Sequence, residues 1–378
     1  MPASTSETDP DAVIAAAEAA VKHRFGDVTI SAPERLSGSS RAQVFRAGLS
    51  GGPGTPASVI LKTPTGVYPP RERAALTLLG RAGVPGAPQL LGVADEPEVL
   101  VLADAGTGPS LADRLTTPDP DAATAALVRW AETTAAFQAA TVGLEAAYAE
   151  ELAALSPLGP PALDTSAELL AEAAVDLAGY LPQIGVTPRP EALATLRTAA
   201  DGFDATARAL DPGDACPDNN VETPAGLVLI DFEFTEFRSV AWQAAYLRVP
   251  WPSCWCSWRM PPEAAGLALD RWRETLAPAL PAVARPEFDE TLDRAVAAWV
   301  LLTTSWFLPS ALAGDPASTD PRRPRPSRRQ ILQYRLGMLA EASLPPDCEP
   351  LRDLAADAYS ATRRAWGEQP LALAPAYR

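Results

Sequence analysis

The first hundred residues contain short β-rich runs of valine, isoleucine, leucine and threonine between polar connections. Runs of this length and composition predict β-strands, and connections such as "GSSR" and "GGPGTP" suit hairpins. Strands that follow one another through short connections pair antiparallel, so we expect one antiparallel sheet. The predicted strands cover residues 28–37, 42–50, 57–64, 88–95 and 98–104.

Two segments in the same part of the chain have the composition and spacing of helices. The first follows Asp9 and Pro10 and runs to about Lys22. Asp is favoured as the N-cap residue, and Pro is favoured at the first helical position. The second covers Pro69 to Gly83, where leucines and alanines recur at helical spacing before a glycine-containing turn. We therefore predict a helix at each segment.

The apolar pattern becomes mainly helical after residue 118. Asp119 and Pro120 begin a helix that is predicted to reach about Gln138, and later alanine- and leucine-rich segments repeat the pattern. The Pro-rich stretch at 156–164 and the stretch at 314–329 are expected to be a connector and a loop.

The length of 378 residues exceeds the usual size of a single core, so we expect two lobes. Residues 1–104 would form a β-rich lobe with a leading helix, and residues 105–378 a larger helical lobe. This division places the chain in the α+β fold class.

The overall composition is typical of a soluble globular protein. Apolar residues make up 47% of the chain. No run approaches the roughly 18 to 20 uninterrupted apolar residues of a membrane span, so no membrane association is expected. The N-terminal sequence "MPASTSETDPDAV" lacks the basic patch and apolar stretch of a secretory signal. We therefore predict a cytoplasmic protein.

The chain is strongly acidic, with 47 Asp and Glu against 31 Lys and Arg and a formal net charge of -16. This balance disfavours a nucleic-acid surface and would raise the local concentration of cationic ligands. Solubility alone accounts for such acidity equally well.

The cysteines are too few and too unevenly placed for a disulfide framework in a chain of this length. We predict free, buried thiols rather than a zinc site, because C-x-C spacing with no histidine nearby is a poor match to structural zinc centres. The four are Cys216, Cys254, Cys256 and Cys348.

Two short segments carry the residues whose chemistry is most specific. The loop "PGDACPDNN" presents Asp214 and Asn219, and "LVLIDFE" delivers Asp231 at the end of an apolar strand. Phosphoryl transfer needs a carboxylate near the attacking hydroxyl, oxygen ligands for magnesium, and a cation on the nucleotide phosphates. These three residues supply the first two kinds of group, which suits a metal–nucleotide site.

In this order and at this separation, the two segments resemble aminoglycoside phosphotransferases and choline or ethanolamine kinases. Their catalytic loop reads H-G-D-x-x-x-x-N and their metal segment I-D-[FW]-E, where this chain has "PGDACPDN" and "LIDFE". The resemblance covers roughly residues 30–250. It implies a bilobal protein-kinase-like fold, ATP or GTP as donor, Mg²⁺, and a small-molecule acceptor. It also implies that Asp214 is the catalytic carboxylate and that Asn219 and Asp231 are magnesium ligands.

Other residues match the same families. Lys62 stands where they have the phosphate-binding lysine, and Glu72 where they have its helix partner. The segment "RLSGSSRAQVFR", with Ser39, is similar to the loop over the nucleotide phosphates. Leu102 and Ala103 stand at the lobe hinge, where the resemblance implies backbone contacts to the adenine edge.

Three departures support an alternative. Pro212 replaces the family's histidine, Gln243 replaces an aspartate that commonly supports the catalytic loop, and Gly38 is the only glycine of the phosphate loop. The alternative is a nucleotide-binding pseudokinase-like protein that acts through association rather than turnover. Glu233 is also open: it either supports a second metal or pairs with a neighbouring cation.

An aromatic segment and a basic run each allow two interpretations. The aromatic residues either line a pocket for a cationic acceptor or form a local aromatic core or a lobe interface, and we favour the second interpretation. The arginines between 322 and 329 either bind a partner or contact phosphate, or they belong to a solvated, mobile connector, which we favour. The aromatic residues are Trp242, Tyr246, Trp251, Trp255 and Trp258, and the arginines are Arg322, Arg323, Arg325, Arg328 and Arg329.

Overall fold

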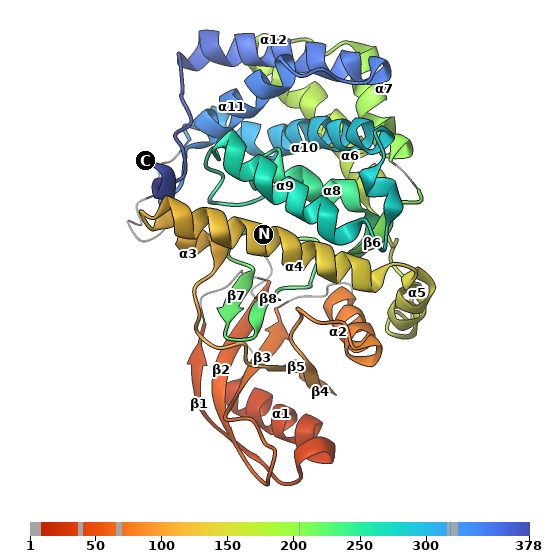
Figure 1. The fold of residues 1–378 in the computed structure, drawn as a ribbon, viewed down its shortest axis with the longest axis vertical. Coiled ribbons are helices and arrows are strands. Elements are labelled where there is room, and N and C mark those ends of the chain that lie inside the picture. Colours follow the sequence, from red (N-terminus) through yellow and green to blue (C-terminus); the bar gives the residue numbers. More distant parts are fainter. Residues whose placement is uncertain (1–8, 37–40, 66–69, 204, 316–317, 319–323) are drawn as a thin grey trace. The chain divides into compact units, whose positions relative to one another are not determined.

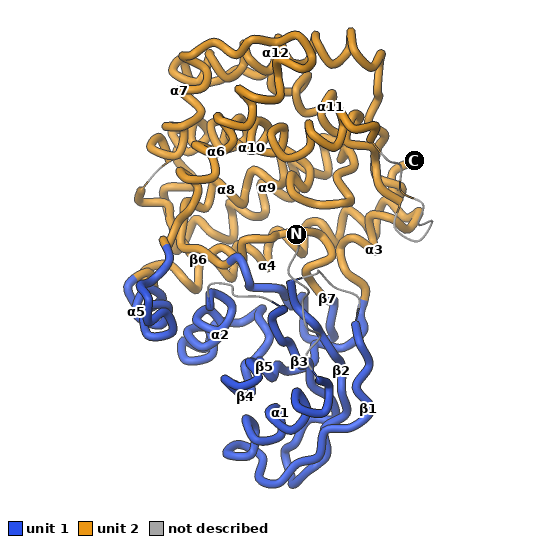
Figure 2. Tube along the Cα trace, turned by 180° about the vertical axis from the view of Figure 1, so that it is seen from behind, with its two compact units in different colours: residues 1–108, 146–161, 221–234 blue, residues 109–145, 162–220, 235–378 orange. Residues whose placement is uncertain are grey.

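The computed structural model describes residues 9–36, 41–65, 70–203, 205–315, 318 and 324–378. They divide into two compact units (Figure 2). The first unit is Met1–Gly108, Ala146–Pro161 and Val221–Phe234, and the second is Pro109–Glu145, Ala162–Asn220 and Thr235–Arg378. The first unit therefore includes two segments beyond residues 1–104 of the sequence-based division.

The first unit contains the predicted antiparallel sheet (Figure 1). Its order is β1-β2-β3-β5-β4, and each neighbouring pair is antiparallel. The central strand β3 pairs Lys62 with Val44 on one side and with Leu100 on the other. The strands are β1 (Thr29–Arg35), β2 (Ala42–Ser50), β3 (Ser58–Pro64), β4 (Leu90–Asp95) and β5 (Glu98–Ala103).

The leading helix α1 (Pro10–Phe25) packs on this sheet (Figure 1). Asp9 is its N-cap as predicted, and the Asp9 carboxylate accepts a hydrogen bond from the N–H of Asp11 at 3.2 Å. The helix buries a stripe at helical spacing, which joins one apolar core with the inner residues of the sheet. That core includes Val13, Ala17, Val21, Ile30, Leu49, Val59, Leu61, Val99 and Val101.

The predicted second helix is α2 (Arg71–Ala82). Gly83 ends it in the left-handed conformation, with φ of +66° and its N–H bonded to the Leu79 carbonyl. The unit also contains most of α5 (Glu145–Ala154) and the two-stranded sheet of β7 (Asn220–Thr223) and β8 (Gly226–Leu229). The N–H of Leu229 donates to the Gly86 carbonyl at 2.8 Å, which ties the end of β8 to the loop after α2.

The second unit is mostly helical, with a small antiparallel pair of β6 (Arg208–Asp211) and β9 (Glu236–Ser239). Its α-helices are α3 (Leu111–Thr116), α4 (Pro120–Thr141), α6 (Ser166–Tyr180), α7 (Pro190–Thr198), α8 (Val240–Ala244), α9 (Pro262–Leu276), α10 (Glu287–Leu312), α11 (Arg328–Ala340) and α12 (Glu349–Trp366). The 3₁₀ helices are η1 (Leu181–Ile184), η2 (Ala199–Gly202), η3 (Ala245–Leu247), η4 (Pro281–Ala284), η5 (Pro346–Cys348) and η6 (Pro375–Tyr377). Asp119 is the N-cap of α4 as predicted, and its carboxylate accepts from the N–H of Ala122 at 3.0 Å.

The core of the second unit forms around α10. This is the one helix in the described ranges that is long and apolar enough to cross a membrane, and 78% of its most apolar stretch is buried inside the protein. Core helices of globular proteins have the same properties.

The expected connector at 156–164 lies between α5 and α6 outside any helix. The expectation for the arginine-rich stretch is wrong at its end, because Arg328 and Arg329 begin α11. Asp315 accepts from both of their N–H groups, and Arg328 stacks 3.7 Å over the ring of Phe307. Because of these contacts, the two arginines are not part of a solvated connector. Arg322 and Arg323 lie outside the described residues.

Candidate active site

Lys62 lies at the centre of an ion cluster within the first unit. Its ammonium nitrogen is 2.7 Å from Glu72 Oε2, 2.5 Å from Asp231 Oδ1 and 3.8 Å from Glu233 Oε2. Strand β3 supplies the lysine, and helix α2 supplies Glu72. The structure therefore brings together three residues that the sequence resemblance singles out, Lys62, Glu72 and Asp231.

The cluster is mostly shielded from water. The side chains of Lys62 and Glu72 are 11% and 10% exposed, and that of Asp231 is 26% exposed. Burial lowers the pKa of Lys62, but the charges of Glu72 and Asp231 outweigh it and hold that pKa above its ordinary value. Burial raises the pKa of Glu72, and Lys62 opposes that change. Lys62 is thus a fixed positive charge across the neutral pH range.

Asp231 follows β8 in a backbone conformation that few residues adopt. Its φ is +68°, in the left-handed region, which Asp tolerates better than most residues other than glycine. The next residue also contacts the cluster, because the N–H of Phe232 donates to Glu72 Oε1 at 3.3 Å. Uncommon backbone conformations cluster at functional positions.

Glu233 pairs with a cation, which was one of its two expected roles. Its Oε1 accepts from Nε of Arg41 at 2.6 Å, and Arg41 stacks 4.8 Å over the ring of Phe234. Arg41 was not predicted as a site residue. It lies within the segment "RLSGSSRAQVFR" that was predicted to be the phosphate loop, and that position was the available signal. Ser39 in that loop lies outside the described residues.

The predicted catalytic loop lies between β6 and β7, and its residues 212–219 belong to the second unit. Gly213 has φ of +90°, a conformation that favours glycine and turns the chain sharply before Asp214. The Asn219 amide donates to the Asp214 backbone carbonyl at 2.9 Å, and the Asn219 N–H donates to the Cys216 carbonyl at 2.9 Å. The loop thus folds back on itself and brings Asp214 and Asn219 together, as the sequence predicted.

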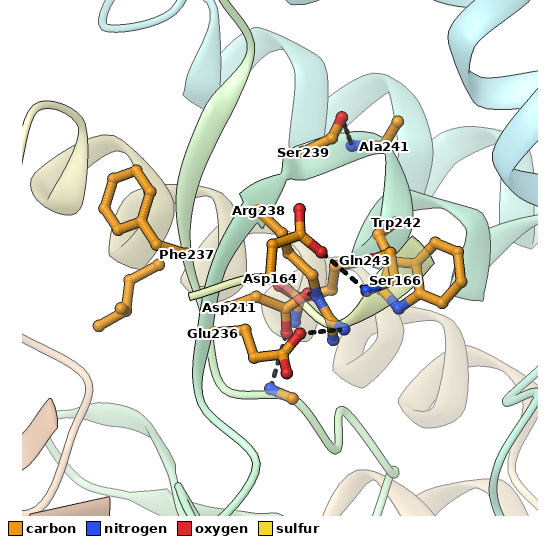
Figure 3. Close-up of polar contacts among 12 residues, drawn as sticks. Asp164, Ser166, Asp211, Glu236, Phe237, Arg238, Ser239, Ala241, Trp242 and Gln243 are labelled. Carbon is orange, nitrogen blue, oxygen red and sulfur yellow. Dashed lines mark hydrogen bonds and ion pairs between the residues drawn. The ribbon is translucent and has the colours of Figure 1, made fainter. Parts of the chain in front are cut away.

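A buried ion network holds the start of this loop (Figure 3). Asp211 accepts from the N–H of Gly213 at 2.7 Å through one oxygen and from Nε of Arg238 at 2.8 Å through the other. Arg238 also donates to Glu236 at 3.2 Å, and Glu236 accepts from the hydroxyl of Thr165 at 2.6 Å. The network therefore links the turn at Gly213 to the start of α6 and to β9.

The side chain of Arg238 is 5% exposed, and those of Asp211 and Glu236 are 4% and 7% exposed. Burial lowers the pKa of Arg238, while the two carboxylates raise it well above its usual value. The sequence reasoning missed both Arg238 and Asp211, although Asp211 directly precedes the substituted Pro212.

Among the hydrogen bonds of the described residues, none joins Gln243 to this loop. Its Oε1 accepts from Nε2 of Gln138 at 2.9 Å, and Gln138 Oε1 in turn accepts from the indole of Trp272 at 2.9 Å. The glutamine thus joins α8 to α4 and α9. In the families that the sequence resembles, this position commonly carries an aspartate that supports the loop; here its side chain forms a hydrogen bond between helices.

The cysteine prediction is wrong for two of the four residues. Cys216 of the catalytic loop and Cys254 form a disulfide across a sequence separation of 38, with 5.5 Å between their Cα atoms. Cys256 and Cys348 are buried free thiols, as predicted. Sequence spacing alone does not show which distant cysteines meet, since the fold sets that distance.

The residues assigned to an adenine edge lie at the end of β5. The N–H of Ala103 donates to the Gln89 carbonyl at 2.9 Å, and Leu102 is buried between Ile60 and Leu90 in the sheet. Asp104 follows, and although burial raises its pKa, Arg46, Gly106 and Ser58 together hold it below its ordinary value. The Asp104 carboxylate accepts hydrogen bonds from Arg46 Nε, Ser58 Oγ and the Gly106 N–H, each at 2.8 Å, and so holds the turn after β5. The sequence did not predict this role.

The aromatic segment forms a core, the interpretation that we favoured. Trp242 and Trp299 lie with ring centroids 4.4 Å apart, and Tyr246 meets Trp299 edge-on at 5.3 Å. Trp242, Tyr246, Trp251 and Trp258 are buried, while Trp255 is half-buried and donates from its indole to Asp218 at 2.7 Å.

No protein-family model matches the chain, and no curated protein matches it in sequence. Solved structures do match. An ethanolamine kinase from Plasmodium vivax is similar at 10% identity, with 85% of this chain and 84% of that chain covered and a TM-score of 0.50.

Two further similar structures are a choline/ethanolamine kinase family protein from Mesorhizobium loti and a choline kinase from Cryptosporidium parvum. The first has 17% identity, 87% and 93% coverage and a TM-score of 0.48, and the second has 10% identity, 89% coverage of each chain and a TM-score of 0.45. The resemblance seen in the sequence is confirmed for the fold: this chain has the α+β, protein-kinase-like fold of the ethanolamine kinase.

Proposed function

We propose that this protein is a small-molecule phosphotransferase that transfers phosphate from ATP or GTP to a hydroxyl group of its acceptor. The observation that carries the proposal is the ion cluster of Lys62, Glu72 and Asp231, in which a buried lysine is paired with one helix carboxylate and one carboxylate after a strand. Protein kinases use the same set of groups to hold nucleotide phosphates and metal. The fold shared with an ethanolamine kinase supports the same reaction class.

The residues proposed as metal ligands are Asp231 of the first unit and Asn219 of the second, and each side chain offers an oxygen donor of the kind that magnesium prefers. The carboxylate of Asp231 is also held by its ion pair with Lys62. Lys62 supplies the permanent positive charge for the α- and β-phosphates, and Glu72 orients it. When bound, magnesium would neutralise phosphate charge. Leu102 and Ala103 remain proposals for the adenine edge.

Asp214 is proposed as the base or orienting carboxylate for the acceptor hydroxyl. The turn at Gly213 and the amide of Asn219 hold its backbone on both sides. A carboxylate at this point accepts the hydroxyl proton or aligns the oxygen for attack, and catalysis then rests on positioning and charge neutralisation.

The acceptor is proposed to be a small metabolite or antibiotic with at least one positive charge. The net charge of -16 supports this class, because it raises the local concentration of cations. The aromatic cluster adds no support, since most of its rings are buried against one another. A cytoplasmic location stays a prediction.

The test is phosphate transfer from ATP and GTP to a panel of hydroxylated amines and sugars, beside nucleotide-dependent thermal stabilisation. We expect magnesium–ATP or magnesium–GTP to raise Tm, because a ligand that binds only the native state shifts unfolding by mass action. We also expect phosphate transfer to a cationic acceptor, at a rate that falls as the ionic strength rises. Stabilisation without transfer to any acceptor would favour the pseudokinase alternative, and no stabilisation at millimolar nucleotide would contradict nucleotide binding.

A further inference from the structure

The segment Pro250–Trp255 contacts the catalytic loop through three consecutive side chains. All of these residues belong to the second unit. The three contacts are a hydrogen bond from Ser253 Oγ to Asp214 Oδ1 at 3.3 Å, the disulfide between Cys254 and Cys216, and a hydrogen bond from Trp255 Nε1 to Asp218 Oδ2 at 2.7 Å. The segment therefore follows the loop over most of its length, and its first contact is with the carboxylate assigned to the acceptor hydroxyl.

The direction of the hydrogen bonds at Ser253 follows from the chemistry of its partners. A hydroxyl has a single proton, and the Ser253 hydroxyl donates it to Asp214 Oδ1. The Tyr246 hydroxyl lies 2.9 Å from the same Ser253 oxygen, and it must then be the donor to it. Burial, with the charge of Asp214, raises the pKa of Tyr246 well above its usual value, so the tyrosine keeps its proton. A directed chain runs from Tyr246 through Ser253 to Asp214.

Arg335 holds the segment on its other side. This arginine on α11 is 1% exposed, and its guanidinium donates to the backbone carbonyls of Pro250, Trp251 and Pro252 at 3.1, 3.2 and 2.9 Å. Trp251 has φ of +47°, which is unusual for a bulky side chain. Such strain persists only where the surroundings determine the backbone, as Arg335 and the disulfide do here.

We propose that Ser253 is a positioning residue for Asp214, with Tyr246 behind it. The inference rests on the proposed function, in which Asp214 faces the acceptor hydroxyl. Through this hydrogen bond, Ser253 fixes the Oδ1 oxygen of the Asp214 carboxylate. In this chain, which lacks the family's histidine and aspartate at Pro212 and Gln243, Ser253 supports the Asp214 carboxylate directly.

The test compares Ser253→Ala, Ser253→Thr and Tyr246→Phe in steady-state phosphate transfer. We expect Ser253→Ala to lower kcat by roughly 3- to 10-fold, with KM for the nucleotide unchanged. This is the range that follows from losing one hydrogen bond of average strength, since the 3.3 Å contact is long. Ser253→Thr keeps the hydroxyl and should restore most of kcat. Tyr246→Phe should lower kcat by a smaller factor, because Ser253 still reaches Asp214.

Ser257→Ala is the matched control. Its hydroxyl donates to the carbonyls of Trp251 and Cys254 at 2.8 and 2.6 Å and so supports the same segment without contacting Asp214. We expect this variant to lower Tm more than kcat, and Ser253→Ala to do the reverse. Equal kcat for Ser253→Ala and wild type, or equal losses for the alanine and threonine variants, would overturn the proposal.

Crystal structures of the wild type and Ser253→Ala give a measurement that does not depend on turnover. We expect the Asp214 carboxylate in one orientation in the wild type and rotated, or in two orientations, in the variant. An unchanged carboxylate would overturn the positioning role even if the wild type showed no phosphate transfer. Absence of transfer by the wild type would contradict the proposed function instead.

Discussion

Lys62 in the first unit and Asp214 in the second are held by different kinds of interaction. Lys62 is fixed by ion pairs with Glu72 and Asp231 at 2.7 and 2.5 Å, from the residues that the family resemblance names. Asp214 lies in a loop held by a disulfide, by the buried ion pair of Arg238, and by Ser253. None of these three supports belongs to the motif that identified the loop.

The difference shows which parts of the candidate site the sequence reveals. The charge proposed to bind phosphate requires a lysine at its position, so its residue type is visible in the sequence. A loop needs only to be held in one conformation, and many combinations of buried groups do this. The loop keeps its turn at Gly213 although Pro212 and Gln243 stand where the families that the sequence resembles have a histidine and commonly an aspartate.

The largest expected effect on stability comes from Arg238→Met, which leaves the buried carboxylates of Asp211 and Glu236 without their cation. Removal of one partner from a buried ion pair costs about 3–5 kcal/mol of the free energy of unfolding. Urea unfolding of the wild type and the variant measures it. As a control, adding Asp211→Asn and Glu236→Gln to the variant should recover part of the loss. A change below about 1 kcal/mol would mean that this network does not hold the loop.

Reduction of the disulfide between Cys216 and Cys254 should have the next largest effect. Dithiothreitol converts the bond to two thiols and is itself oxidised to its cyclic disulfide. For a cross-link over this separation of 38 residues, the loss of stability is about 2–4 kcal/mol. The double variant Cys216→Ser/Cys254→Ser should match the reduced wild type and show no further response to dithiothreitol. Equal Tm values for the oxidised and reduced wild type would contradict this assignment.

Lys62→Met tests the ion cluster of the first unit. It leaves Glu72 and Asp231 facing each other without a cation, but Asp231 is partly exposed, so the loss of stability should be about 1–3 kcal/mol. The stabilisation by magnesium–ATP should also weaken strongly. Lys22, which forms an exposed ion pair with Asp27, is the control, and Lys22→Met should change neither measurement. If Lys62→Met keeps the full nucleotide-dependent shift in Tm, Lys62 does not bind phosphate.

Local patterns in the sequence were sufficient for most of the first unit. The five strands, the cap at Asp9 and the glycine at the end of α2 depend on neighbouring residues, and the structure confirms them, as it confirms the cap at Asp119 in the second unit. Lys62 and Glu72 were predictable as a pair because the resemblance supplied their partnership. Short-range patterns carry this information directly.

The supports of the catalytic loop were not predictable, because each joins residues that are distant in the sequence. Arg238 meets Asp211 across 27 positions, and Ser253 meets Asp214 across 39. The sequence around a serine or an arginine does not show which distant residue its side chain contacts. The disulfide was not predicted for the same reason. The aromatic segment was easier, since a dense run of large rings predicts a core wherever it packs.

The most direct test of the account is a comparison of Asp214→Asn with Asp231→Ala, measured as magnesium–ATP affinity and as acceptor-dependent phosphate transfer. Asp214→Asn should lower kcat by roughly 10²-fold or more and leave nucleotide affinity near the wild-type value, because its carboxylate acts on the acceptor. Asp231→Ala should lose both nucleotide affinity and transfer, because Asp231 is the proposed magnesium ligand. Asp121→Asn, at an exposed position on α4, is the control and should change neither. Full turnover by Asp214→Asn would contradict the account, because the loop at residues 212–220 would then not be a catalytic loop.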